Sequence, residues 1–103
     1  MATAAHTPAM DCSGVHFSGH ALRRMFERGV GAAAIRGVVR FGEVVDDYPD
    51  DTPFPSCLLL GEGAGEPLHV VVARNPVDSR CYIITVYWPD PDLWEPGFKV
   101  RKR

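Results

Sequence analysis

The chain has 103 residues, 46% of them hydrophobic, and its 11 basic and 13 acidic residues give a net charge of −2. This length holds one small domain and leaves no room for a second. No stretch approaches the ~20 apolar residues of a membrane span. The first 15 residues lack the pattern of a secretory signal, and the three cysteines, Cys12, Cys57 and Cys81, are an odd number. We therefore expect a cytoplasmic protein in a reducing compartment, without a disulfide framework.

Charge is distributed unevenly along the chain. Residues 1–42 have a net charge of +3, residues 43–95 of −9 and residues 96–103 of +4. An anionic polymer would be attracted by the two basic ends and repelled by the acidic middle, which could instead meet a basic partner. An acidic run opens this middle segment and fits either a cation site or, as we favour, a solvated loop. It consists of Glu43, Asp46, Asp47, Asp50 and Asp51.

Two helices are expected in the first half of the chain. Residues 1–14 show no periodicity and should form a disordered tail. Ser18 can cap a helix over residues 19–28, which Gly29 would end in a left-handed conformation. A second helix is expected over residues 32–41. The apolar stripes of the two helices are Ala21, Leu22, Met25 and Phe26, followed by Ile35, Val38 and Val39.

The second half of the chain has the composition of β-structure. Aromatic and β-branched residues are frequent, and turns rich in Gly, Asn and Pro separate the runs. Four strands are expected over residues 43–48, 56–62, 68–74 and 80–88. Prolines at positions 89, 91 and 96 then exclude a central strand, so the chain should end in an extended arm that Trp94 pins.

The order of these elements predicts an α+β domain over residues 15–95, followed by a basic arm over residues 96–103. Two N-terminal helices would pack on a four-stranded antiparallel sheet in the order ααββββ. Hairpins symmetric about Val77 and Ala64 would place His69 across from Thr85 and beside Leu59. One sheet face is then plain core, with Leu68, Val70 and Val72, and the other has a polar centre of His69, Thr85 and Tyr87.

A basic stripe follows one side of the first expected helix. His20, Arg24 and Arg28 recur at intervals of four, so their side chains share that side. Three donors in a row suit an anion, especially a phosphodiester. The alternative is the solvated face of an amphipathic helix, which the helix alone favours.

His69 is the more informative histidine because it lies inside an apolar strand. It is either a hydrogen-bonded core group or an acid or base that titrates near neutrality. Tyr87 can be structural, or it can orient a phosphate or stack on a base. Lys99 and Arg101, in the basic end, belong either to a phosphate-contacting arm or to a feature that favours solubility.

Signals for a metal or a cofactor are weak. Cys12, His16 and His20 are spaced at four, but the sequence has neither a CxxC nor an HExxH motif. Glycines 61, 63 and 65 lie in a turn between strands and not before a helix, where a phosphate loop would be. We expect no metal and no cofactor.

Several motifs together resemble a known family. The run from Phe17 to Val30 is similar to the "HA…RM…RG(I/V)" opening of the bacterial family called domain of unknown function 4258. Segments 41–45, 50–56, 67–71 and 84–94 resemble further motifs of the family in the same order. The resemblance covers residues 15–103.

The resemblance implies a fold and an activity. Such proteins look like small toxins of the RelE/ParE-like ribonuclease fold, and some are encoded beside antitoxin-like proteins. This chain is then expected to be a metal-independent endoribonuclease of a toxin–antitoxin system, which acts on RNA or the ribosome and has an antitoxin-like partner. The oligomeric state stays open, and no membrane is implied.

The chemistry that such an enzyme needs can be assigned to the candidate residues. His20, Arg24 and His69 would be catalytic, while Arg28, Thr85, Tyr87, Lys99 and Arg101 would bind the substrate. Whether His20 and His69 share one site depends on how the first helix crosses the sheet. The acidic middle is unlike the surface of an RNA-binding toxin. The alternative is a non-catalytic protein- or nucleic-acid-binding module of the same fold.

Overall fold

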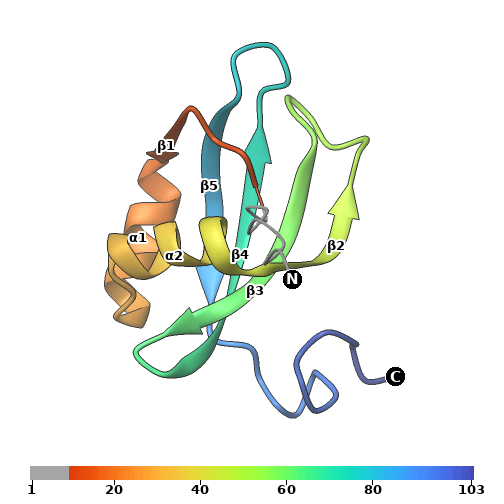
Figure 1. Cartoon of the computed structure of the whole chain (residues 1–103). Coiled ribbons are helices and arrows are strands. Elements are labelled where there is room, and N and C mark those ends of the chain that lie inside the picture. Colours follow the sequence, from red (N-terminus) through yellow and green to blue (C-terminus); the bar gives the residue numbers. More distant parts are fainter. Residues whose placement is uncertain (1–9) are drawn as a thin grey trace, which may run out of the picture.

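The computed structural model describes residues 10–103. The elements of these residues are β1 (Gly14–Phe17), α1 (Gly19–Arg28), α2 (Ala32–Phe41), β2 (Glu43–Tyr48), β3 (Ser56–Gly63), β4 (Glu66–Arg74) and β5 (Arg80–Tyr87). The strands form one sheet in the order β1-β5-β4-β3-β2, and both helices cover the same face of it (Figure 1). We call this face the helix face and the opposite one the outer face.

The α+β class is confirmed, but the prediction of four antiparallel strands is wrong. The described residues form five strands, because β1 precedes the helices and pairs in parallel with β5. The sheet is therefore mixed. A segment of four residues is too short for a period-2 pattern to identify it as a strand. The bounds predicted for both helices and for β2 are confirmed, and those of the other three strands lie within two residues.

The helix ends form as their sequences predict. The Ser18 hydroxyl accepts a hydrogen bond from the amide of Ala21 at 3.0 Å, and Gly29 has the left-handed φ of 67° that ends α1. Glycine also allows α2 to approach the sheet, since a Cβ on Gly61 of β3 would lie 2.6 Å from Val38 Cγ2. Among the described residues, neither helix is long and apolar enough to cross a membrane.

The core lies between the helices and the helix face. The predicted stripe of α2 is confirmed, because Ile35, Val38 and Val39 are buried. The stripe of α1 is only half correct: Ala21 and Met25 are buried, but Leu22 is 52% and Phe26 90% exposed. α1 packs on the β5 side of the sheet, where a narrow stripe is sufficient. The core members that the strands supply are Cys57, Leu59, Leu68, Val70, Val72, Cys81, Ile83 and Val86.

The strand register differs from the symmetric one that we predicted. Ala64 and Gly65 both have positive φ and form a two-residue turn, so His69 pairs with Leu60 and not with Leu59. A bulge in β5 and an asymmetric β4–β5 turn shift the other hairpin by two residues, so His69 lies opposite Tyr87 and not Thr85. Around His69 the shift by two residues keeps Thr85 and Tyr87 on their predicted face, whereas a shift by one residue moves Leu59 to the helix face.

Residues 10–14 of the predicted disordered tail are attached to the domain. The amide of Met10 bonds to the carbonyl oxygen of Val39 at 3.1 Å, and that of Ser13 to Ser79 at 2.9 Å. A disulfide joins Cys12 to Cys81 in β5, so the expectation of a chain without a disulfide framework is wrong. The count is odd because the third cysteine, Cys57, is free and buried. The rest of the predicted tail, residues 1–9, lies outside the described residues.

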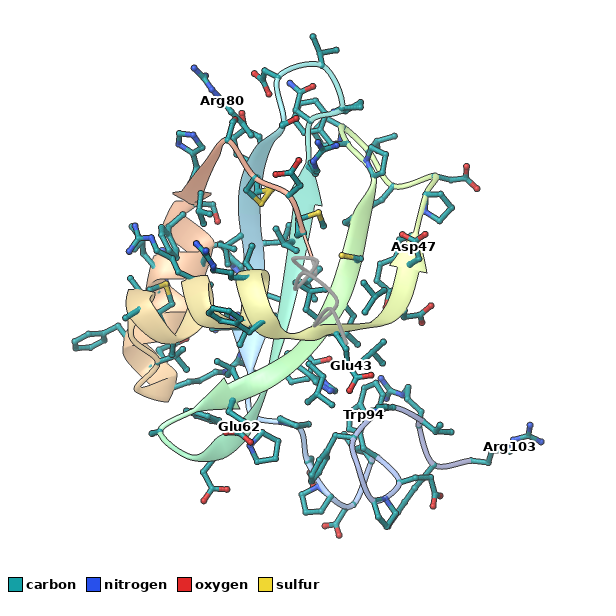
Figure 2. All side chains as sticks on the ribbon, viewed as in Figure 1. Glu43, Asp47, Glu62, Arg80, Trp94 and Arg103 are labelled. Carbon is teal, nitrogen blue, oxygen red and sulfur yellow. A yellow bond between two sulfur atoms is a disulfide. The ribbon has the colours of Figure 1, made fainter. Side chains whose placement is uncertain are left out.

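The C-terminal segment folds back on itself instead of forming an extended arm. It leaves the end of β5 and returns beside the beginning of β2 (Figure 1), where Trp94 lies near Glu43 (Figure 2). A β-bridge joins Trp94 to Arg101, and the amide of Glu95 bonds to the carbonyl oxygen of Val100 at 2.7 Å. The prediction that Trp94 pins this segment is confirmed, because its side chain is 6% exposed.

Candidate functional site

His20 and His69 lie on opposite faces of the sheet. α1 carries the exposed His20 and packs against the helix face through Ala21 and Met25. Leu68 and Val70 belong to the same core, so the alternation of side chains along β4 directs His69 to the outer face. The sheet therefore separates the two imidazoles, and they cannot act on one phosphate.

The basic stripe of α1 is largely occupied by contacts within the protein. Arg24 forms an ion pair with Glu27 at 2.7 Å. The guanidinium of Arg28 donates to the carbonyl oxygen of Val86, and its own carbonyl oxygen accepts a hydrogen bond from the Trp88 indole at 2.8 Å. Arg28 thus holds the end of β5 against α1, which is a structural task.

His69 is enclosed by the C-terminal segment. It is 0% exposed, and its ring packs edge-on against Tyr87 and Trp94, with centroids 5.1 and 4.6 Å away. Its Nε2 lies 2.8 Å from the carbonyl oxygen of Phe98, which accepts only, so we assign the ring hydrogen to Nε2. Nδ1 is buried and has no hydrogen-bond partner among the described residues. Burial lowers the pKa of His69, although the bond to Phe98 opposes this.

A groove runs along the outer face beside His69, and we call it the outer groove. Its volume is about 370 Å³. β2, β3 and β5 supply one wall and the C-terminal segment the other. Its lining residues are Val45, Asp46, Tyr48, Leu58, Tyr87, Trp94, Lys99, Val100 and Arg101.

The polar groups of the outer groove influence one another. Burial raises the pKa of Tyr87, Tyr48 raises it further, and the Arg101 guanidinium opposes both. Burial likewise raises the pKa of Tyr48, and the carboxylate of Asp46 adds to this by its charge and by a hydrogen bond. Two phenols, a carboxylate and a guanidinium therefore meet in one partly dry groove.

Of the predicted binding residues, three line this groove and one lies on the same face. Lys99 is paired with Glu43 at 3.0 Å, and the Arg101 guanidinium lies 5.3 Å above the Trp94 ring. Tyr87 contacts His69 directly, while Thr85 pairs with Val71 farther along the face. The structure thus brings His69, Tyr87, Lys99 and Arg101 together and leaves His20, Arg24 and Arg28 on the other side.

Sequence reasoning missed Asp46 and Tyr48 as members of this groove. The interpretation as a solvated loop covers Asp46, and Tyr48 is predicted only as the end of a strand. The sequence does not show that the C-terminal segment closes over this strand. The period-2 spacing of the two residues was the available signal, since Asp46 and Tyr48 share one side of their strand. Other carboxylates of the run do fit the loop interpretation, as Asp51 accepts hydrogen bonds from Thr52 and Ser56.

A metal site has no support among residues 10–103. No group of three or more His, Cys, Asp or Glu side chains in this part of the chain could hold an ion. Cys12, one of the three candidates at intervals of four, is bonded to Cys81.

The fold and the groove define a small α+β domain with a mixed sheet whose outer face is partly covered by its own C-terminal segment. A family model described as "Domain of unknown function (DUF4258)" matches residues 17–88, and the chain belongs to this family. No curated protein and no solved structure matches the chain. The C-terminal segment, which supplies Lys99 and Arg101, lies beyond the matched residues.

Proposed function

We propose that this domain binds RNA in the outer groove and cleaves it there without a metal ion, as a toxin-like endoribonuclease. One observation carries the proposal: Lys99 and Arg101 share the groove with Tyr87, whose ring contacts His69. Cations, a hydroxyl donor and an imidazole are the groups that metal-free cleavage of RNA requires. The RelE/ParE-like resemblance points to the same activity, by analogy.

The reaction would be an internal transesterification. A base removes the proton of a ribose 2′-hydroxyl, the 2′-oxygen bonds to phosphorus, and the bond from phosphorus to the 5′-oxygen breaks. The products are a 2′,3′-cyclic phosphate and a 5′-hydroxyl. His69 suits the base because its lowered pKa keeps it neutral near pH 7. Tyr87 would donate to the leaving oxygen, while Arg101 and Lys99 would stabilise the phosphorane.

The test compares variants of the two faces. Purified protein is incubated with a mixed-sequence RNA in chelator, and cleavage products are followed for wild type, His69→Gln, Arg101→Ala and His20→Gln. We expect His69→Gln and Arg101→Ala to lose at least about a hundredfold in rate, while His20→Gln keeps full activity. Equal loss in His20→Gln, or no loss in His69→Gln, would overturn the assignment to the outer face.

A second candidate function is a non-catalytic RNA-binding module. The burial of His69 favours it, because an imidazole that is 0% exposed does not touch a ligand in this state of the protein. A binding module would hold the same RNA with an affinity that depends on salt and little on pH, and would not cleave it. An antitoxin-like partner remains a prediction for either function.

A further inference from the structure

The segment that covers His69 is built as a separate unit. We call residues 93–102 the strap. Backbone hydrogen bonds within it join Lys102 to Leu93 at 2.9 Å and Phe98 to Glu95 at 2.9 Å, in addition to the bridge between Trp94 and Arg101. These bonds join the two ends of the strap and give it a hairpin-like shape.

Few contacts attach the strap to the rest of the domain. At its start the amides of Leu93 and Trp94 bond to the carbonyl oxygen of Asp90, at 2.9 and 3.1 Å. Its polar contacts with the sheet among the described residues are the bond from His69 to Phe98 and the ion pair of Lys99 with Glu43. Trp94 adds apolar burial against His69. The ion pair is half exposed and contributes little. The attachment thus depends mainly on Trp94 and on one hydrogen bond.

The backbone at this hydrogen bond is strained. Phe98, whose carbonyl oxygen His69 holds, has a φ of 60°, and Gly97 before it has a φ of 92°. A non-glycine residue with positive φ is held there by its surroundings. Because the Phe98 amide bonds to Glu95 within the strap, this turn belongs to the strap and depends on the glycine at position 97.

The strap also separates two hollows. On one side lies the outer groove, and on the other a groove of about 670 Å³ between the end of α2, the β3–β4 hairpin and Gly97 and Phe98. His69 lies beneath the strap between them, because it contacts both Trp94 of the first groove and Phe98 of the second. Opening would expose His69 and join the two grooves into one channel.

We propose that the strap is an autoinhibitory cover, which lifts as a unit to admit single-stranded RNA between itself and His69 and closes again when the RNA leaves. Lys99 and Arg101, which the strap carries, then face the RNA from the strap side of the channel. This inference rests on the proposed function for the identity of the ligand. The opening and closing of the strap do not depend on that function. An opening that is seldom populated would reduce the apparent affinity for RNA by the closed-to-open ratio.

The first variant of the test loosens the strap and keeps every side chain of the groove, whereas the second, Trp94→Ala, removes one of them. Gly97→Ala places an L residue at φ 92°, which is strained, and no atom lies within 4 Å of the new Cβ. Gly65→Ala is the matched control, because Gly65 has a φ of 79° and equal space but lies in the β3–β4 turn. Trp94→Ala is a second loosening variant, and the exposed Leu93→Ala its control.

Two readouts are independent of RNA. Amide hydrogen exchange is measured over residues 93–102, and the ring of His69 is titrated by NMR. We expect exchange in the strap to accelerate at least about fivefold in Gly97→Ala, and His69 to titrate nearer its ordinary pKa of 6.5. Neither should change in Gly65→Ala. Unchanged exchange in both loosening variants, or equal acceleration throughout the domain, would overturn the strap as a separate unit.

Binding of a short single-stranded RNA oligonucleotide then tests what the strap admits. If the strap covers an RNA site, the loosening variants bind more tightly by about the same factor as exchange accelerates. If exchange accelerates and His69 titrates freely but RNA affinity is unchanged, RNA is not the ligand. That result would overturn the proposed function and the gating of RNA, while the cover would stand.

Discussion

The location of His69 inside an apolar strand is predicted correctly from the sequence, but its hydrogen-bonding environment is predicted only in part. An imidazole in an apolar strand was expected to be either a satisfied core group or a titrating one. It is buried, yet only Nε2 has a partner among the described residues. Burial thus keeps His69 neutral and leaves Nδ1 able to accept a proton. A core residue can in this way still act as a base.

The lowered pKa of His69 predicts a dependence of stability on pH. Below its ordinary pKa of 6.5 the unfolded chain binds a proton at this residue that the folded domain does not yet bind. The free energy of unfolding should therefore fall as the pH decreases from about 7 through 6.5 towards the folded pKa. Urea unfolding of wild type and His69→Gln between pH 5 and 8 measures it, and curves that stay parallel would contradict the prediction.

Two glycines should respond to alanine in opposite directions. At Gly61 the new Cβ would overlap Val38, so we expect a loss of about 1–3 kcal/mol. At Gly37, inside α2, no atom lies within 4 Å and helix propensity predicts a gain of up to about 1 kcal/mol. Thermal unfolding of both variants makes the comparison, and a stabilised Gly61→Ala would show that α2 can move away from β3.

Among the elements, the helix ends could be predicted from the sequence because they depend on interactions between neighbouring residues. Ser18 and Gly29 predict both ends of α1 correctly, because a helix cap forms its hydrogen bonds within its own turn. The pairing of His69 was predicted with the wrong partners because a β-bulge and a type of turn decide register, and neither has a strong signal in residues 75–85. The outer groove could not be predicted, since β2 and the C-terminal segment, which are more than 40 residues apart in sequence, face each other only after that segment folds back.

The disulfide between Cys12 and Cys81 should stabilise the domain considerably. It closes a loop of 69 residues, for which the chain-entropy model gives on the order of 4 kcal/mol. The Cys12→Ser/Cys81→Ser double variant should lose about this amount in chemical unfolding. Dithiothreitol should destabilise wild type to the same degree and leave the double variant unaffected. A wild type insensitive to reduction would mean that the two cysteines are not joined in solution.

Across the whole molecule, the charge segments of the sequence partly neutralise one another. The basic end returns to the acidic middle, where Lys99 meets Glu43, while Arg103 points away from the fold (Figure 2). The basic helices lie on the opposite face of the sheet. The binding of an anion in the outer groove therefore depends on very few cations. The net charge of −2 does not indicate where an anion would bind.

This scarcity of cations predicts a small salt dependence of RNA binding. For single strands the slope of log K against log salt is roughly −0.7 for each phosphate neutralised. Arg101→Ala should reduce the slope by about that amount. Arg80→Ala, at the far end of β5 (Figure 2), should leave it unchanged. A slope that responds to Arg80 and not to Arg101 would place the RNA elsewhere.

The position of β2 at the edge of the sheet has a consequence for the protein in storage and in crowded solution. A free edge is a template for pairing with another chain, and β2 carries two common protections, a bulge and the carboxylates of Glu43, Asp46 and Asp47. Two such edges repel each other through these charges. Loss of one charge weakens the repulsion and leaves the edge in place, so copies can extend one another's sheets. Asp47→Asn should therefore aggregate at a lower protein concentration than wild type, as light scattering would measure.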